Sequence, residues 1–150
     1  EDFCSEEIIT KAIELKNVIV KQDLHEKNLR KSLNFGHNIG HALESSLIGQ
    51  KKDILHGEAI AAGMIMESDI ALSLKKITAK ENKEIRDYVS SIYTPVKISK
   101  ETKSHLLQYI QHDKKNVGND LCFALPKKIG YYELYCGVKL ELIEKVIDNY

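Results

Sequence analysis

One stretch, HGEAIAAGMIMESDIALSL at residues 56–74, constrains the fold more than any other, because it is apolar on nearly every side. A helix that is hydrophobic all round has to be buried, so other elements must surround it. The chain has 150 residues, enough to bury ~70% of the surface that the unfolded chain exposes. We therefore predict a single domain, residues 1–150, built around this helix.

The segments on either side of this helix carry the signals of a mainly α-helical domain. Thr78 and Glu81 have the spacing of a capping box, which marks the start of a helix that ends before Pro95. Gly36 and Gly40 leave room on another helix for the close approach of a neighbour. The segments LCFALP and YYELYC flank KKIG as a β-hairpin near residues 120–136. The predicted helices cover about residues 5–22, 29–48, 56–74, 78–92, a segment from about 99 and one from about 140.

Charge and cysteine content exclude several classes of protein. Lys and Arg number 22, as do Asp and Glu, so the chain lacks the basic excess that nucleic-acid binding requires. No apolar run approaches the ~20 residues of a membrane span. Cys4, Cys122 and Cys136 are odd in number and lack CxxC spacing, which favours free thiols in a reducing compartment. We expect a cytoplasmic protein with no nucleic-acid or membrane partner.

Histidines dominate the candidate functional residues. His37 and His41 stand four apart, so their rings emerge on one face of a helix. Zinc takes three or four protein ligands, and His56 is the obvious candidate for a further ligand. Asn38 stands where an HExxH helix has its glutamate, so that interpretation fails. Two metal ligands, a ligand beside a catalytic base, and two ordinary helical histidines all remain open from spacing alone.

A row of polar side chains extends the face that carries these histidines. Arg30, Asn34, His37 and His41 follow one another at intervals of four, three and four, and Glu26 precedes them by four. A guanidinium, an amide and two imidazoles on one face are suited to holding an anionic, hydroxylated substrate against a metal. The alternative is a solvated polar face.

Four segments together resemble a known family. Residues 23–44 (DLHEKNLRKSLNFGHNIGHALE), 55–64 (LHGEAIAAGM), 113–115 (DKK) and 124–130 (ALPKKIG) are similar to the C-terminal domain of 3-dehydroquinate synthase. The resemblance spans almost the whole chain. It implies the helical half of a two-domain enzyme whose N-terminal NAD-binding domain precedes residue 1. The first methionine of the sequence is Met64, which agrees with the expectation that another segment precedes residue 1.

The resemblance also implies an activity, that of a carbon-oxygen lyase in the shikimate pathway, which serves aromatic amino acid biosynthesis. This family converts 3-deoxy-D-arabino-heptulosonate 7-phosphate, a phosphorylated sugar acid, into 3-dehydroquinate and phosphate. It uses NAD and a divalent metal, usually zinc, with cobalt as a possible substitute. A homodimer of the full-length enzyme is expected, and the 150-residue chain is expected to be inactive alone.

Roles are carried over from the family residue by residue. His37 and His56 match the two metal-ligand histidines, and a glutamate of the preceding domain would be the third ligand. His41 matches a proton acceptor on the substrate side, and Glu26 a second one. The remaining matches are substrate-binding: Lys16 and Arg30 near the carboxylate, and Asn34 and Lys114 near the phosphate. The residues that bind NAD are expected in the preceding domain.

Three other functions compete with this interpretation. The nearest is another sugar phosphate cyclase or a glycerol-dehydrogenase-like enzyme. The motif LNFGH together with Arg30 favours 3-dehydroquinate synthase over these enzymes. A second is an HD-type metal phosphohydrolase using His112 and Asp113, but Lys114 and Lys115 beside that pair oppose a bound cation. The third is a non-enzymatic helical interaction module with incidental histidines.

Overall fold

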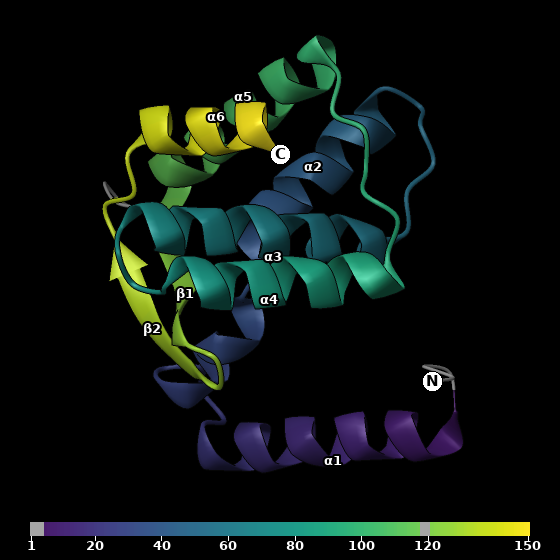
Figure 1. Cartoon of the computed structure of the whole chain (residues 1–150), viewed down its shortest axis with the longest axis vertical. Helices are drawn as coiled ribbons and strands as arrows, with labels where there is room; N and C mark the ends of the chain where they lie inside the picture. The colour runs from purple at the N-terminus through teal and green to yellow at the C-terminus, as the bar shows by residue number, and fades with distance from the viewer. Residues whose placement is uncertain (1–4, 118–120) are drawn as a thin grey trace. The chain divides into compact units, whose positions relative to one another are not determined.

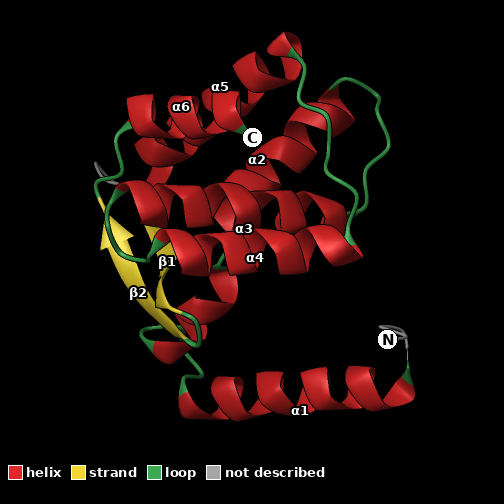
Figure 2. Ribbon diagram, in the orientation of Figure 1, coloured by secondary structure: helices red, strands yellow, loops and turns green. Residues whose placement is uncertain are grey.

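The computed structural model describes residues 5–117 and 121–150, and for residues 113–117 it describes the backbone alone. Figure 1 traces the chain, and Figure 2 distinguishes its helices and strands. The elements are α1 (Glu6–Gln22), the 3-10 helix η1 (Leu29–Asn34), α2 (His37–Gly49), α3 (His56–Ser73), α4 (Ala79–Ile92), α5 (Lys100–Val117), β1 (Cys122–Lys128), β2 (Tyr131–Cys136) and α6 (Leu140–Asn149). This arrangement confirms the predicted mainly helical fold class with a small hairpin.

The chain separates into two compact units, residues 1–33 and residues 34–150. In the first unit, α1 begins after Ser5, whose side chain accepts a hydrogen bond from the N–H of Ile8. Each residue of α1 is at least partly exposed to solvent. The prediction of a single domain stays a prediction.

Helix α3 lies at the centre of the second unit, as its apolar sequence predicted. It contacts α2, α4, α6 and β1, and Figure 2 shows it side by side with α4. Buried residues occur along it from Ala59 to Ala71. Ala61 and Ile65 face Val89 of α4, while other residues of α3 join the main core.

The main core is built from α2, α3, α5, α6 and the hairpin. Its largest fully buried side chains include Ile39, Leu43, Met66, Ile70, Leu106, Phe123, Leu125 and Ile143. Each such side chain contributes about 1.5–3 kcal/mol to stability through its removal from water. Among the described residues, no helix is long and apolar enough to cross a membrane.

The hairpin corrects one expectation about the cysteines. Cys122 and Cys136 are register partners at the end of β1 and β2, and the structure joins them by a disulfide. The prediction of free thiols is therefore wrong for this pair, and Cys4 lies outside the described residues. Spacing rules failed because the pairing depends on strand register across 14 residues. The cytoplasmic location loses the support of the cysteine pattern and stays a prediction.

The predicted helix at residues 29–48 is also wrong as a single element. The chain forms η1, turns at Gly36, and only then begins α2. Gly36 has a φ of 83°, in the left-handed region where glycine has no steric penalty. The carboxyl group of Glu67 accepts hydrogen bonds from the N–H groups of Gly36 and Ile39, which caps the new helix. This cap comes from α3, so local sequence around the turn does not reveal it.

Candidate metal centre and substrate cavity

Three glycines bring the backbones of α2 and α3 close together. A Cβ on Gly63 would overlap the carbonyl oxygen of Gly36 and lie 2.7 Å from the amide nitrogen of Gly40. A Cβ on Gly40 would lie 3.0 Å from the carbonyl oxygen of Ala59. The close approach expected from Gly36 and Gly40 is therefore confirmed. It sets the distance between the histidines of α2 and the histidine that begins α3.

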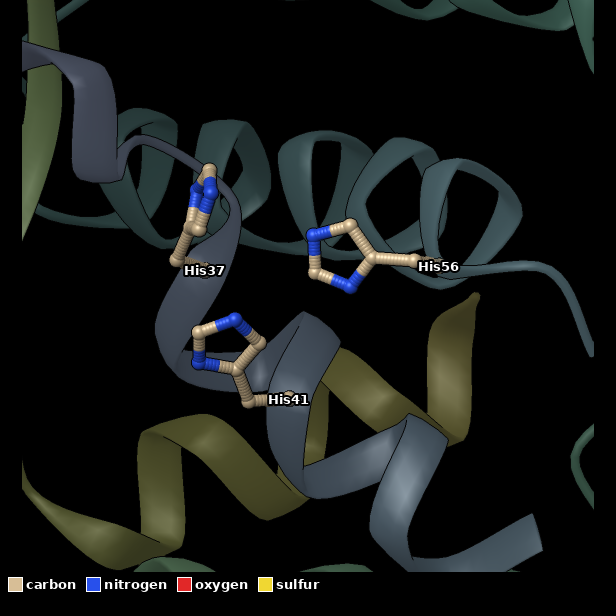
Figure 3. A group of neighbouring side chains, drawn as sticks. All are labelled: His37, His41 and His56. Carbon is tan, nitrogen blue, oxygen red and sulfur yellow. The ribbon is translucent and has the colours of Figure 1, made fainter. Parts of the chain in front are cut away.

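His37, His41 and His56 form one cluster at this crossing (Figure 3). Each offers one ring nitrogen, and these three nitrogens all lie within 4.8 Å of one another. The ring centroids are 5.2 Å apart for His37 and His41, 6.1 Å for His37 and His56, and 5.5 Å for His41 and His56. The rings point toward a common space between the two helices.

Neighbouring oxygen atoms orient the rings of His37 and His56. His37 Nδ1 lies 3.2 Å from the carbonyl oxygen of Phe35. His56 Nδ1 lies 3.0 Å from Oε2 of Glu44. An oxygen acceptor at Nδ1 places the proton there and leaves the lone pair of Nε2 available, as is usual for metal-binding histidines. Sequence reasoning missed Glu44, although it stands on α2 three residues after His41.

A cavity of about 420 Å³ adjoins the cluster. Its wall includes Asn34, His37 and His41 of the predicted site, together with Ser45. Tyr109 and His112 of α5 also line it, and the sequence did not indicate them for this site. The combination of an amide, imidazoles and hydroxyl groups offers donors to a phosphorylated, hydroxylated ligand.

The other predicted site residues lie elsewhere in the chain. Lys16, Glu26 and Arg30 belong to the first unit, so their roles stay predictions. Within that unit, Arg30 Nε lies 3.8 Å from Oε2 of Glu26. The side chain of Lys114 lies outside the described residues, and its role stays a prediction as well.

Asp23 orders the loop that carries Glu26 and Arg30. Its carboxylate accepts hydrogen bonds from the N–H groups of Lys27, Asn28 and Arg30, at 2.9, 2.7 and 3.0 Å. Desolvation raises the pKa of Asp23, but these three donors and the positive charge of Arg30 together outweigh it and leave the pKa below its ordinary value. Glu26 has a φ of 53°, so the loop turns sharply at this residue.

The donors in the cluster suit a divalent transition metal. Imidazole nitrogen is a preferred ligand of zinc and cobalt, and an incomplete protein ligand set leaves a position for substrate. The three rings are at least partly exposed, so a bound ion could be reached by a ligand in the cavity. The geometry brings His41 as close as the other two and does not by itself separate a ligand from a substrate-binding histidine.

Comparison with protein families gives one match over most of the chain. The family described as 3-dehydroquinate synthase C-terminal matches residues 1–116. A 3-dehydroquinate synthase of Helicobacter pylori strain HPAG1 is 37% identical over 149 residues, which is 98% of this chain and 42% of that protein. The enzyme of the same name from Crocosphaera subtropica is 38% identical, over 95% of the chain and 39% of that protein. The chain thus spans less than half the length of these relatives.

Solved structures of sugar phosphate cyclases share the fold. A 2-deoxy-scyllo-inosose synthase, complexed with carbaglucose-6-phosphate, NAD⁺ and Co²⁺, superposes with a TM-score of 0.81 at 26% identity. The match covers 96% of this chain and 40% of that one. The 2-epi-5-epi-valiolone synthase of Streptomyces hygroscopicus, with NAD⁺ and Zn²⁺ bound, has a TM-score of 0.77 at 21% identity over 95% and 39% of the chains. The second likeness concerns the fold alone.

Proposed function

Because the chain belongs to the 3-dehydroquinate synthase C-terminal family, we propose that it is the metal- and substrate-binding part of a 3-dehydroquinate synthase. The reaction converts 3-deoxy-D-arabino-heptulosonate 7-phosphate into 3-dehydroquinate and phosphate, with NAD and a divalent metal as cofactors. The observation that carries the proposal is the cluster of three imidazoles at the crossing of α2 and α3. An NAD-binding segment outside this chain would complete the active site.

In this proposal His37 and His56 are the metal ligands. Their Nδ1 atoms already face oxygen acceptors, which directs each Nε2 away from those oxygens. A bound divalent ion would polarise hydroxyl and carbonyl oxygens of the substrate, and NAD would supply reversible hydride transfer. Zinc is the expected ion, and cobalt is a substitute of similar ligand preference.

The residues of the cavity hold the substrate and move its protons. Asn34 and His41 line the same cavity, where an amide donor and an imidazole can bind the phosphate. Lys114 is proposed to add a positive charge at the phosphate. The phosphate could itself take the proton lost during elimination, so His41 need only hold it in place.

The first unit is proposed to contribute the remaining substrate contacts. Lys16 and Arg30 would bind the substrate carboxylate, for which a guanidinium offers two parallel donors. Glu26, next to Arg30, would be the second proton acceptor. A cytoplasmic homodimer is part of the same proposal.

Metal binding by the chain tests this function directly. We expect the 150-residue chain to bind Co²⁺ weakly, because a third protein ligand is expected from outside it. His37→Ala and His56→Ala should each abolish measurable binding in a Co²⁺ titration followed by absorption spectroscopy. His105→Ala, which removes a histidine of α5 outside the cluster, is the matched control. Equal Co²⁺ affinity in the parent and both ligand variants would refute the proposed site.

A further inference from the structure

Glu67 is a fully buried acidic residue on α3, with none of its surface exposed. Its Oε2 accepts a hydrogen bond from the N–H of Gly36 at 2.7 Å, and its Oε1 accepts one from the N–H of Ile39 at 3.1 Å. Burial raises the pKa of Glu67 to about 8, and the N–H groups of Ile39, Gly36 and Asn38 oppose that rise. The position thus carries a desolvation cost that an apolar residue would avoid.

The two hydrogen bonds replace the cap that α2 lacks in its own sequence. The first N–H groups of a helix have no partners within the helix. In an ordinary capping box, side chains of the first turn itself satisfy the N–H groups of the N-cap and N3 residues. Here the N-cap residue is Gly36, which has no side chain, and N3 is Ile39. Glu67 satisfies both N–H groups from the neighbouring helix.

This cap acts on the turn that presents the histidines. His37 is the first residue of α2, directly between the two N–H groups that Glu67 binds, and His41 follows one turn later. Glu67 and His56 belong to the same helix, α3, so the two hydrogen bonds tie the start of α2 to the helix that carries the third imidazole. The overlap that a Cβ on Gly63 would cause shows how close the two backbones are at this point.

We propose that Glu67 is a positioning residue of the metal centre: its carboxyl group fixes the first turn of α2 and thereby the place of the His37 ring relative to His56. The metal part of this inference rests on the proposed function, whereas the capping contact does not. In this role Glu67 is neither a metal ligand nor a substrate-binding residue.

The test compares Glu67→Gln with Glu81→Gln in the 150-residue chain. Glutamine keeps the shape of Glu67 but has one acceptor oxygen for two N–H groups. We expect faster hydrogen exchange of the Gly36 or Ile39 amide and a tenfold to hundredfold loss of Co²⁺ affinity, the usual effect of disturbing a residue that supports a ligand. Glu81 caps α4 through its hydrogen bonds with Thr78, so its variant should lose stability and keep its Co²⁺ affinity.

A purely structural cap would give a different result. If Glu67→Gln and Glu81→Gln both lowered the melting temperature while Co²⁺ affinity stayed at the parent value, the proposal would be overturned. Glu67→Asp keeps both acceptor oxygens on a shorter side chain, and it is the test variant if Glu67→Gln does not fold. Parent-level Co²⁺ affinity in that variant would overturn the proposal equally.

The two proposals can fail separately. Failure of the parent chain to bind Co²⁺ at His37 and His56 would refute the proposed function. In that case amide exchange at Gly36 and Ile39, together with the ¹⁵N ring signals of His37, decides the inference. A change in the His37 ring signals together with faster exchange of either amide in Glu67→Gln would support it, and parent-like His37 signals would overturn it.

Discussion

His41 differs from His56 in what surrounds it, because His41 lines the cavity while His56 is not among the lining residues and is hydrogen-bonded to Glu44. We predict that His41→Ala in the intact enzyme keeps its metal but turns over more slowly by ~10²–10⁴-fold, the usual loss for a proton acceptor. His56→Ala should lose metal and activity together. Metal analysis and steady-state kinetics of the purified variants measure both quantities. A metal-free His41 variant beside a metal-loaded His56 variant would reverse the assignment.

The raised pKa of Glu67 makes a prediction about stability and pH. Its carboxyl has an ordinary pKa of 4.5 and a folded-state pKa of about 8. Between these values the folded chain holds a proton that the unfolded chain releases, so this contribution to stability falls as pH rises through about 8. The slope approaches about 1.4 kcal/mol per pH unit for one group.

Urea unfolding from about pH 5 to about pH 9 measures this slope. Glu67→Gln removes the titrating group, so the unfolding free energy of the variant should depend less on pH than that of the parent. Other titrating groups contribute alike to both proteins and cancel in the difference. Parallel curves for the two proteins would contradict the buried, protonated state of Glu67.

At the scale of elements, the crossing of α2 and α3 depends on the absence of a side chain at Gly63. We predict that Gly63→Ala costs about 1–3 kcal/mol, the usual range for an added methyl group in a packed core. The helices must also separate, so Co²⁺ affinity should fall. Gly49→Ala is the matched control, because its Cβ would lie 3.7 Å from the Tyr109 hydroxyl, an ordinary contact. Thermal unfolding and Co²⁺ titration of the two variants measure these effects, and equal effects in both would argue against a crossing that depends on the missing side chain at Gly63.

Most elements could be predicted from local sequence because their signals are local. The capping box of Thr78 and Glu81 does begin α4. Ser99 accepts a hydrogen bond from the N–H of Thr102, at the predicted start of α5. The apolar α3 does occupy the centre of its unit. In each case the residues that determine the element lie within or next to it.

The errors concern features that need contacts between distant residues. The break between η1 and α2 depends on Glu67, which is 31 residues from Gly36 in the chain. The disulfide depends on the register of β1 with β2. The histidine cluster was partly predictable, since His37 and His41 share a helical face, but the contribution of His56 required either the resemblance or the crossing of α2 and α3. Tyr109 and His112 reach the cavity through packing of α5 on α2, for which the sequence held no signal.

At the scale of the whole molecule, the chain corresponds to about 40% of the length of its relatives. The proposed reaction needs a nucleotide site and a third metal ligand, both of which are expected from a segment outside this chain. We predict that the purified 150-residue chain, supplied with NAD and Zn²⁺, forms no 3-dehydroquinate. A phosphate-release assay measures this, and turnover by the chain alone would show that it already contains a complete site.

The most direct test of the proposed function uses the chain joined to the NAD-binding segment that the proposal expects. With NAD and Zn²⁺ or Co²⁺, this protein should release phosphate from 3-deoxy-D-arabino-heptulosonate 7-phosphate and form 3-dehydroquinate in equal amount. It should leave a hexose 6-phosphate and glycerol unchanged, and His37→Ala should abolish the reaction. If the metal-loaded protein instead cyclised the hexose phosphate or oxidised glycerol, and left the heptulosonate phosphate intact, the assignment to 3-dehydroquinate formation would be wrong.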